Sequence, residues 1–249
     1  MAQYDSFAPF YDAVNGEPEE LTSQILSAFG RFEPGAHRIL ELGCGTGAVL
    51  AGLGSGFDLT GIDLSAAMLA HARRRTPGAR LLEADITCFE LPETFDAAIC
   101  VFDTLNHIVS LDGWKSVLDN VAHHLRDGGL FVFDLNTVGR LRDLGDMAPW
   151  VYDFDGHTLI MDVDFAAEPI AVWDIRIFEH RGGDSYRLHH ETIKELGVSL
   201  ATVREMLSEH FEILEESDTQ GSSPSDHSLR AFIVARRVPR RGAAATPGN

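Results

Sequence analysis

Residues 38–47 read RILELGCGTG, a short apolar run that ends in a loop with three glycines. An apolar, β-rich run before such a loop, with helical periodicity after it, is typical of the first strand-loop-helix unit of a nucleotide-binding sheet. Without side chains at Gly43, Gly45 and Gly47, the backbone can approach a bound cofactor closely. Ala48 also fits the last position of the dinucleotide pattern G-x-G-x-x-G/A, so the loop alone leaves the kind of nucleotide open.

Outward from this loop, β-rich and helical stretches alternate along the chain. Strands are expected over residues 38–42, 58–62, 80–84, 97–102 and 130–135. Helices are expected over residues 46–53, 65–75 and 113–125, with Ser65 placed to cap the second of them. The alternation predicts an α/β fold with a Rossmann-like, doubly wound sheet. A helix over residues 200–210 and strands near 212–216 and 229–236 would complete seven strands.

Residues 150–197 change from helical periodicity to strict alternation. Leu159, Met161 and Val163 alternate with Ile160, Asp162 and Asp164, and Gly182-Gly183 predicts a hairpin turn. We therefore expect an inserted antiparallel β-cap over residues 150–197, which is also the candidate surface for a homodimer. The other expected segments are an N-terminal helical lid over 1–35, a cofactor-binding core over 36–149, closing elements over 198–238 and a disordered tail over 239–249. The basic end of the chain is expected to aid solubility, through Arg236, Arg237, Arg240 and Arg241.

Composition excludes several classes of function. The 249-residue chain has a net charge of −18, which opposes binding to nucleic acid and favours a neutral or cationic small molecule. No stretch has the roughly 20 apolar residues needed to cross a bilayer, and the N-terminus lacks a secretory signal, so a cytoplasmic protein without membrane contact is expected. Cys44, Cys88 and Cys100 form no CxxC pair, which predicts reduced thiols and no structural zinc site.

Three carboxylates near the glycine loop narrow the choice of ligand. Asp63 ends the second strand, 20 residues after Gly43, where a carboxylate can accept hydrogen bonds from ribose hydroxyls. Asp85 ends the third strand, where it can accept an adenine amino group while Ile86 covers the ring. Glu41 precedes the loop and suits an amino group, whereas it would repel a pyrophosphate. This combination disfavours a dinucleotide such as NAD.

With these residues, the sequence resembles the class I S-adenosylmethionine-dependent methyltransferases. ELGCGTG is similar to the first motif of that family, GIDLSAAML to its acidic second-strand motif, EADI to its adenine motif and LRDGGLFVFDLN to its fifth-strand motif. The resemblance implies S-adenosylmethionine as methyl donor and S-adenosylhomocysteine as product. For Met68, core packing is the alternative to a cofactor contact. The implied cofactor site comprises Tyr11, Glu41, Gly43, Cys44, Gly45, Gly47, Asp63, Leu64, Met68, Asp85, Ile86 and Phe102.

Candidate catalytic residues lie at the end of the fourth strand and near the N-terminus. Methyl transfer depends chiefly on aligning the nucleophile behind the methyl group and, where needed, on removing a proton. His107 is the first candidate for the base or orienting group because imidazole titrates near neutral pH, with a surface or capping role as the alternative. Tyr11 is the second candidate, because an N-terminal Tyr-Asp segment often closes over the cofactor in this family. Its alternative role is aromatic packing on the sheet.

The Tyr-Asp start, the histidine after the fourth strand and the β-cap most resemble bacterial small-molecule N-methyltransferases that dimethylate amino sugars. That resemblance implies an amine acceptor, such as an amino sugar or another secondary metabolite. Acidic residues of the cap would suit a cationic amine, unless they form a solvated face: Asp162, Asp164, Asp174 and Glu191. O-methylation of a small molecule and cofactor binding without catalysis are the alternatives.

A metal-dependent mechanism is also considered. Asp103, Asp134 and Asn136 could hold a magnesium ion that acidifies a catechol. Metal-dependent O-methyltransferases place an adjacent Asp-Asn pair after the fifth strand, however, and Leu135 separates the two residues here. We therefore expect no metal site.

Overall fold

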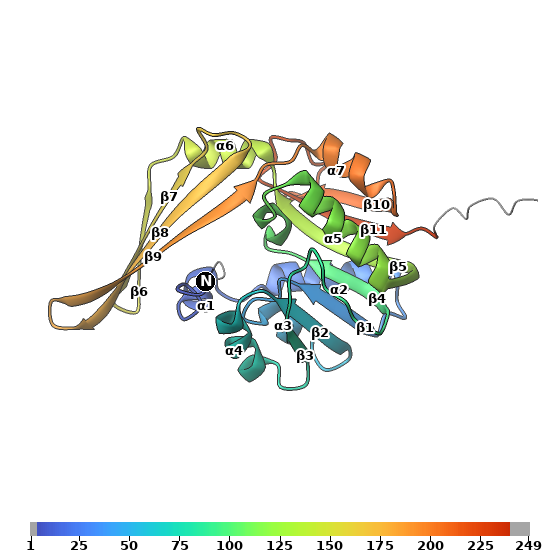
Figure 1. Cartoon of the computed structure of the whole chain (residues 1–249), viewed down its shortest axis with the longest axis horizontal. Coiled ribbons are helices and arrows are strands. Elements are labelled where there is room, and N and C mark those ends of the chain that lie inside the picture. Colours follow the sequence, from blue (N-terminus) through green and yellow to red (C-terminus); the bar gives the residue numbers. More distant parts are fainter. Residues whose placement is uncertain (1–3, 240–249) are drawn as a thin grey trace, which may run out of the picture.

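The computed structural model describes residues 4–239 and places their strands in two sheets (Figure 1). The larger sheet has seven strands in the order β10-β11-β5-β4-β1-β2-β3, and the smaller has four in the order β6-β7-β8-β9. The predicted seven-stranded α/β sheet and the separate antiparallel sheet are thereby confirmed. The tail predicted to be disordered lies outside the described residues from 240 onward, as do residues 1–3 of the expected lid.

Parallel pairing defines the centre of the large sheet. Neighbouring strands from β3 to β5 pair in parallel, whereas β11 is antiparallel to both β5 and β10. The strands have these bounds: β1 Arg38–Leu42, β2 Asp58–Asp63, β3 Arg80–Glu83, β4 Phe95–Cys100, β5 Leu125–Asn136, β10 Phe211–Asp218 and β11 Arg230–Arg237. Because the parallel strands point the same way, their carboxyl ends meet at one edge of the sheet.

Helices cover both faces of the large sheet. On one face, α5 (Leu111–His124) and α7 (Leu200–Leu207) bury apolar side chains such as Trp114 and Val203. On the other, α2 (Glu19–Phe32), α3 (Ala48–Leu53) and α4 (Ala66–Arg75) bury Ile25, Leu50 and Leu69. As expected, Ser65 caps α4, its hydroxyl accepting the N–H of Met68 at 3.1 Å. Two apolar faces explain why the central strands are apolar throughout.

Several local expectations differ from the structure. Within the N-terminal segment expected to be helical, residues 4–10 form turns that lead into the short helix α1 (Tyr11–Asn15). Helix α6 (Val138–Gly145) follows β5 and was not expected. Arg236 and Arg237 belong to β11 and not to a basic tail, because their side chains donate to backbone carbonyls of neighbouring elements: Arg236 to Gly128 and Phe32, and Arg237 to Leu125.

The smaller sheet consists of β6 (Trp150–Phe154), β7 (His157–Asp164), β8 (Ile170–Gly182) and β9 (Ser185–Leu196). The hairpin of β8 and β9 extends away from the large sheet, and α1 lies beneath it (Figure 1). One face of the small sheet packs against the N-terminal segment: Phe7 and Phe10 contact Leu159, Ile175, Ile177 and Ile193. Residues 4–16 therefore lie between the two sheets. Within residues 4–239, no helix has the length and apolar character to cross a membrane.

Candidate functional site

The carboxyl ends of β1 to β4 surround a cavity of about 370 Å³, here called the first cavity. Loops after each of these strands contribute to its wall, together with α4 and the N-terminal segment. Every residue expected to bind the cofactor lines it except Gly47. The lining also includes the candidate base His107, and the full predicted set found there is Tyr11, Glu41, Gly43, Cys44, Gly45, Asp63, Leu64, Met68, Asp85, Ile86 and Phe102.

The glycine loop turns sharply at each of its glycines. Gly43, Gly45 and Gly47 have φ values of 67°, 52° and 76°, a region that favours glycine. A Cβ atom on Gly43 would collide with the side chain of Thr104. A Cβ atom on Gly47 would lie 3.1 Å from the Cβ atom of Ala72. Gly47 therefore allows α3 and α4 to pack closely against each other, and it does not face the first cavity.

Asp63 connects the glycine loop to the end of β2. Its Oδ2 atom accepts the N–H of Gly45 at 2.8 Å, and its Oδ1 atom accepts the N–H of Ser65 at 2.8 Å. Burial raises the pKa of Asp63, and these two backbone donors oppose the rise. The carboxylate thus fixes the loop and still lines the first cavity, where it can accept hydrogen bonds from a ligand.

Glu41 presents an unsatisfied oxygen inside the protein. Its side chain is 2% exposed and lines the first cavity, and Oε2 has no hydrogen-bond partner among the described residues. Burial raises the pKa of this carboxyl well above its usual value, with Asp63 adding to the rise. A buried polar atom without a partner is costly, so an amino group in the cavity would satisfy it. The site therefore fits a ligand with a cationic end next to β1.

A second cavity, of about 360 Å³, lies between the large sheet and the small sheet. Tyr4, Tyr11 and Phe102 line both cavities and so form the boundary between them. Apolar side chains of the small sheet form one side of the second cavity: Met161, Trp173, Ile175 and Ile193. Charged side chains lie in its wall as well: Asp103, Arg140, Glu195 and Arg230.

His107 contacts Tyr4 at this boundary. The Tyr4 hydroxyl lies 3.1 Å from His107 Nε2, and His107 Nδ1 lies 3.4 Å from the carbonyl oxygen of Lys194. Since a carbonyl only accepts, the ring proton belongs on Nδ1, and Nε2 accepts from Tyr4. Burial lowers the pKa of His107, although Asp103 opposes the shift, so the ring is neutral at neutral pH.

Comparison with known proteins assigns the chain to a class of enzyme. Residues 39–129 match the model of a methyltransferase domain. A protein of Geobacillus sp. (strain WCH70) that carries a methyltransferase name without a stated acceptor is 28% identical over 94% of this chain and 99% of its own length. Residues 39–129 are therefore the methyltransferase domain of an S-adenosylmethionine-dependent enzyme. Its cofactor is accordingly S-adenosylmethionine.

Two further comparisons describe the neighbourhood of this methyltransferase. A dTDP-3-amino-3,6-dideoxy-alpha-D-glucopyranose N,N-dimethyltransferase from Streptomyces fradiae is 36% identical, over 51% of this chain and 52% of that protein. The crystal structure of an S-adenosylmethionine-dependent methyltransferase from Clostridium acetobutylicum ATCC 824 has a TM-score of 0.84 and covers 95% of this chain and 99% of that one. At 24% identity, the latter comparison establishes the fold.

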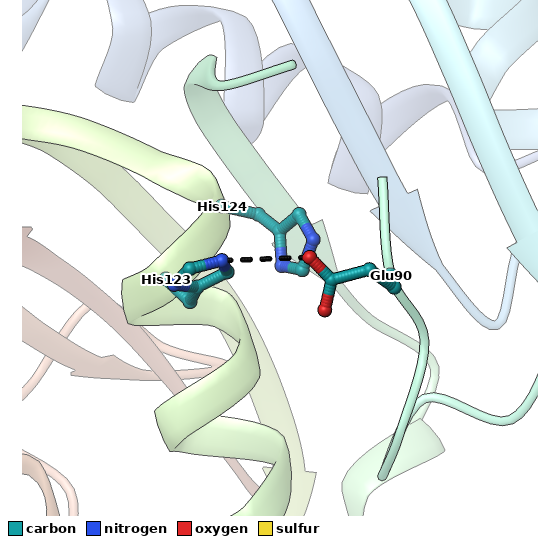
Figure 2. Close-up of side chains that lie close together, drawn as sticks. All are labelled: Glu90, His123 and His124. Carbon is teal, nitrogen blue, oxygen red and sulfur yellow. Dashed lines mark ion pairs between the residues drawn. The ribbon is translucent and has the colours of Figure 1, made fainter. Parts of the chain in front are cut away.

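The methyltransferase contains two groups of potential metal ligands among its described residues. Figure 2 shows the first, in which His123 pairs with Glu90 beside His124. His124 Nδ1 donates to the Asn120 carbonyl at 2.8 Å, and Nε2 accepts the N–H of Leu91 at 3.0 Å. Both ring nitrogens of His124 are therefore used in packing, which leaves only two exposed side chains for an ion.

The second group, Asp103, His107 and Glu195, lies where the two cavities adjoin and is also engaged with protein partners. Asp103 and Asp134, the carboxylates considered for magnesium, bind the guanidinium of Arg230 at 2.6 and 2.9 Å. His107 is occupied by Tyr4 and Lys194, as described above. The geometry is that of an internal ion-pair network.

Sequence reasoning missed part of the site of the methyltransferase. Tyr4, rather than Tyr11, contacts His107, and only the Tyr4-Asp5 pair pointed to it. Glu195, Arg140 and Arg230 carry no recognisable motif. Of the acidic cap residues considered for substrate binding, Asp174 pairs instead with Arg176 and His190, and Glu191 accepts the backbone N–H groups of Tyr4 and Phe7.

Proposed function

We propose that the protein transfers a methyl group from S-adenosylmethionine in the first cavity to an amine nitrogen of a small molecule in the second cavity. The observation that carries this proposal is the boundary formed by Tyr4, Tyr11 and Phe102, which line both cavities. A donor and an acceptor can meet there without either leaving its own cavity. Because methyl transfer needs alignment more than chemical activation, such a meeting point is the main requirement.

In the first cavity, each predicted residue has a distinct role in this proposal. Glu41 binds the amino group of the methionyl end, which supplies the missing partner of its buried oxygen. Asp63 accepts the ribose hydroxyls, and Asp85 with Ile86 borders the adenine. The cofactor supplies an electrophilic methyl group on a sulfonium. The chain's own residues orient it toward Phe102 and the second cavity.

At the boundary of the two cavities, the Tyr4–His107 pair removes the proton that a protonated amine must lose before it can act as a nucleophile. The Tyr4 oxygen accepts this proton while its own hydroxyl proton passes to His107 Nε2, 3.1 Å away. A neutral His107 is the form that can accept, and its lowered pKa keeps it neutral. Tyr11 packs edge-on against Tyr4, with ring centroids 5.8 Å apart, and orients it.

Charges in the second cavity support an amine as the acceptor. Glu195 is 2% exposed and lines this cavity beside Asp103, where it can pair with a cationic group. The guanidinium of Arg140 lines the same cavity, and no ion pair occupies it within the described chain. An acceptor with an amine and a separate anionic group would satisfy both. Relatives named as N,N-dimethyltransferases of dTDP-linked amino sugars act on molecules of this kind.

A screen of acceptors tests the proposal. The protein is incubated with S-adenosylmethionine and a panel of amino sugars, other small amines and matched hydroxy compounds, and methylated products are identified by mass spectrometry. We expect N-methylated products from the amines, in amounts that fall in a Tyr4→Phe variant. Products only from the hydroxy compounds would make it an O-methyltransferase. Cofactor binding without any product would indicate a non-catalytic protein.

A further inference from the structure

The turn that follows β4 has an unusual backbone. Phe102 and Asp103 have φ values of 57° and 51°, the left-handed region that residues with a Cβ atom rarely adopt. Two consecutive residues of this kind store strain unless their surroundings hold them in place. The turn lies at the boundary of the two cavities, because Phe102 lines both and the 3-10 helix η1 (Thr104–His107) follows directly.

A partly buried ion-pair network, with Asp134 as its buried member, holds this turn from two neighbouring strands. Asp134 of β5 accepts the backbone N–H of Asp103 at 2.8 Å through Oδ1 and pairs with Arg230 Nη1 at 2.9 Å through Oδ2. Arg230 of β11 in turn donates from Nη2 to Asp103 Oδ1 at 2.6 Å. Both the backbone and the side chain of Asp103 are thus fixed to the large sheet.

Asp134 itself touches neither the cofactor nor the acceptor. It is 1% exposed and lines neither cavity, whereas Asp103 and Arg230 line the second one. Removing one member of a buried network leaves the others without their partners, which would release the turn from its strained geometry. Any effect of Asp134 on methyl transfer must therefore pass through the turn.

We propose that Asp134, through Arg230 and Asp103, is a positioning residue that fixes Phe102 and His107 at the boundary where donor and acceptor meet. This inference rests on the proposed methyl transfer between the two cavities. A shift of about 1 Å at such a boundary can cost about a hundredfold in rate, because the attacking atom must lie in line with the methyl group. Loss of the network should consequently lower kcat more than it weakens cofactor binding.

The test compares Asp134→Asn and Asp134→Leu. The first keeps an oxygen for the N–H of Asp103 but loses the ion pair, and the second loses both. We expect a graded fall in kcat, about tenfold for the first and about a hundredfold for the second. The calorimetric Kd for S-adenosylhomocysteine should rise by less than kcat falls, since Glu41, Asp63 and the glycine loop line the first cavity outside this turn.

Asp96→Asn provides a matched control. Asp96 accepts the backbone N–H groups of His37 and Arg38, each at 2.9 Å, and pairs with Arg126 at 2.8 Å, away from both cavities. Its loss should destabilise the fold to a similar degree without changing kcat. If kcat is unchanged in both Asp134 variants, or falls equally in Asp96→Asn, the network only stabilises the fold and the inference is wrong.

A second readout needs no acceptor. NMR titration of His107 provides it. Burial and Arg230 lower the pKa of His107, whereas Asp103, the Lys194 carbonyl and Asp63 raise it, and the ring is hydrogen-bonded to the Tyr4 hydroxyl and the Lys194 carbonyl. In Arg230→Met, Asp103 loses its partner and the opposing charge is gone, so the pKa of His107 should rise. If the pKa of His107 is unchanged in Arg230→Met, the inference is wrong, even if no amine is ever methylated. If that pKa rises but no acceptor yields a product, only the proposed function is contradicted.

Discussion

Glu41 illustrates how a single buried carboxyl can identify the end of a ligand. In Glu41→Gln we expect S-adenosylhomocysteine to bind about 10- to 100-fold more weakly, because a charge-assisted hydrogen bond contributes about 1.5–3 kcal/mol. The pKa of Glu41 is raised by burial, and only the ionised form attracts an ammonium group. Affinity should therefore increase as the pH rises through that pKa, and this dependence should disappear in the variant. Calorimetry at several pH values measures both effects.

An exposed carboxylate serves as the control for Glu41. Asp58 starts β2 outside the first cavity, so Asp58→Asn should leave the Kd and its pH dependence unchanged. Equal affinities of Glu41→Gln and the unsubstituted protein would show that the buried oxygen has no ligand partner.

His107 and Tyr4 should control the acidic side of the pH profile. The lowered pKa of His107 means that the ring becomes protonated only below the usual histidine range, so kcat/KM should stay constant to a lower pH than for an ordinary histidine and then fall. His107→Asn and Tyr4→Phe should each lower kcat about 10²- to 10⁴-fold and remove this decline. His123→Asn, on the exposed side of α5, should do neither. Full turnover in His107→Asn at every pH would exclude the base role.

At the residue scale, the sequence predicted site residues best where they lie at or just after the end of a strand, because the end of the strand determines where the side chain lies. Asp63 and Asp85 were assigned because the carboxyl ends of parallel strands share one edge of a sheet. Tyr4 and Glu195 come from segments that fold against this edge from far away in the chain. Their meeting with His107 depends on how the small sheet is attached, and no local pattern records that.

At the scale of elements, α6 and β9 supply two of the charged side chains that line the second cavity, Arg140 and Glu195. Alternation predicted β9 as a strand but not which of its faces meets the site, and α6 was not predicted at all. Its residues read VGRLRDLG, eight positions that contain two glycines and carry little helical signal. Thr137 nevertheless caps the start of α6 by accepting the N–H of Arg140. Leu141 and Leu144 pack the helix against apolar residues of the small sheet.

Helix α6 also offers a matched pair of arginines for testing the acceptor. Arg140 lines the second cavity, whereas Arg142, two residues later, pairs with Glu168 at 2.7 Å on the surface. We expect Arg140→Gln to weaken binding of glucosamine 6-phosphate about tenfold, while binding of glucosamine is unaffected, because only the former has an anionic group. Arg142→Gln should change neither. Calorimetry in the presence of S-adenosylhomocysteine measures these affinities.

A different outcome would redefine the acceptor. If the phosphate adds no affinity in the unsubstituted protein, or if its contribution persists in Arg140→Gln, the acceptor has no anionic group at α6. The proposed role of Glu195 would be unaffected, because it concerns the amine and not the anionic group.

At the scale of the whole molecule, the N-terminal segment joins the two sheets into one site. Glu191 of the small sheet accepts backbone N–H groups of Tyr4 and Phe7, while Asp12 receives a hydrogen bond from Thr46 at 2.6 Å in the glycine loop. The aromatic residues Tyr4 and Tyr11 near the start of the chain line both cavities. The turns that precede α1 depend on partners supplied by both sheets, which no local sequence pattern records.

The opposite face of the small sheet is the surface on which we expect homodimerisation. Strand register places Val151, Ile160, Phe178 and Leu188 on the face turned away from Leu159 and Ile177, which are buried. Val151 and Leu188 are 66% and 54% exposed, and exposed apolar side chains gathered on a sheet commonly mark protein contacts. A second copy of the chain would bury them. Analytical ultracentrifugation should accordingly detect a dimer at micromolar concentration.

Charge substitutions on that face should dissociate the dimer. In Val151→Lys combined with Leu188→Lys, two like charges per subunit would have to be desolvated in the contact, so a monomer is expected. The Kd for S-adenosylhomocysteine should be unchanged, because neither residue lines a cavity. Leu26→Lys, at an exposed position of α2, should leave the dimer intact. A monomeric unsubstituted protein, or a dimer that survives both lysines, would mean that the small sheet serves the acceptor site alone.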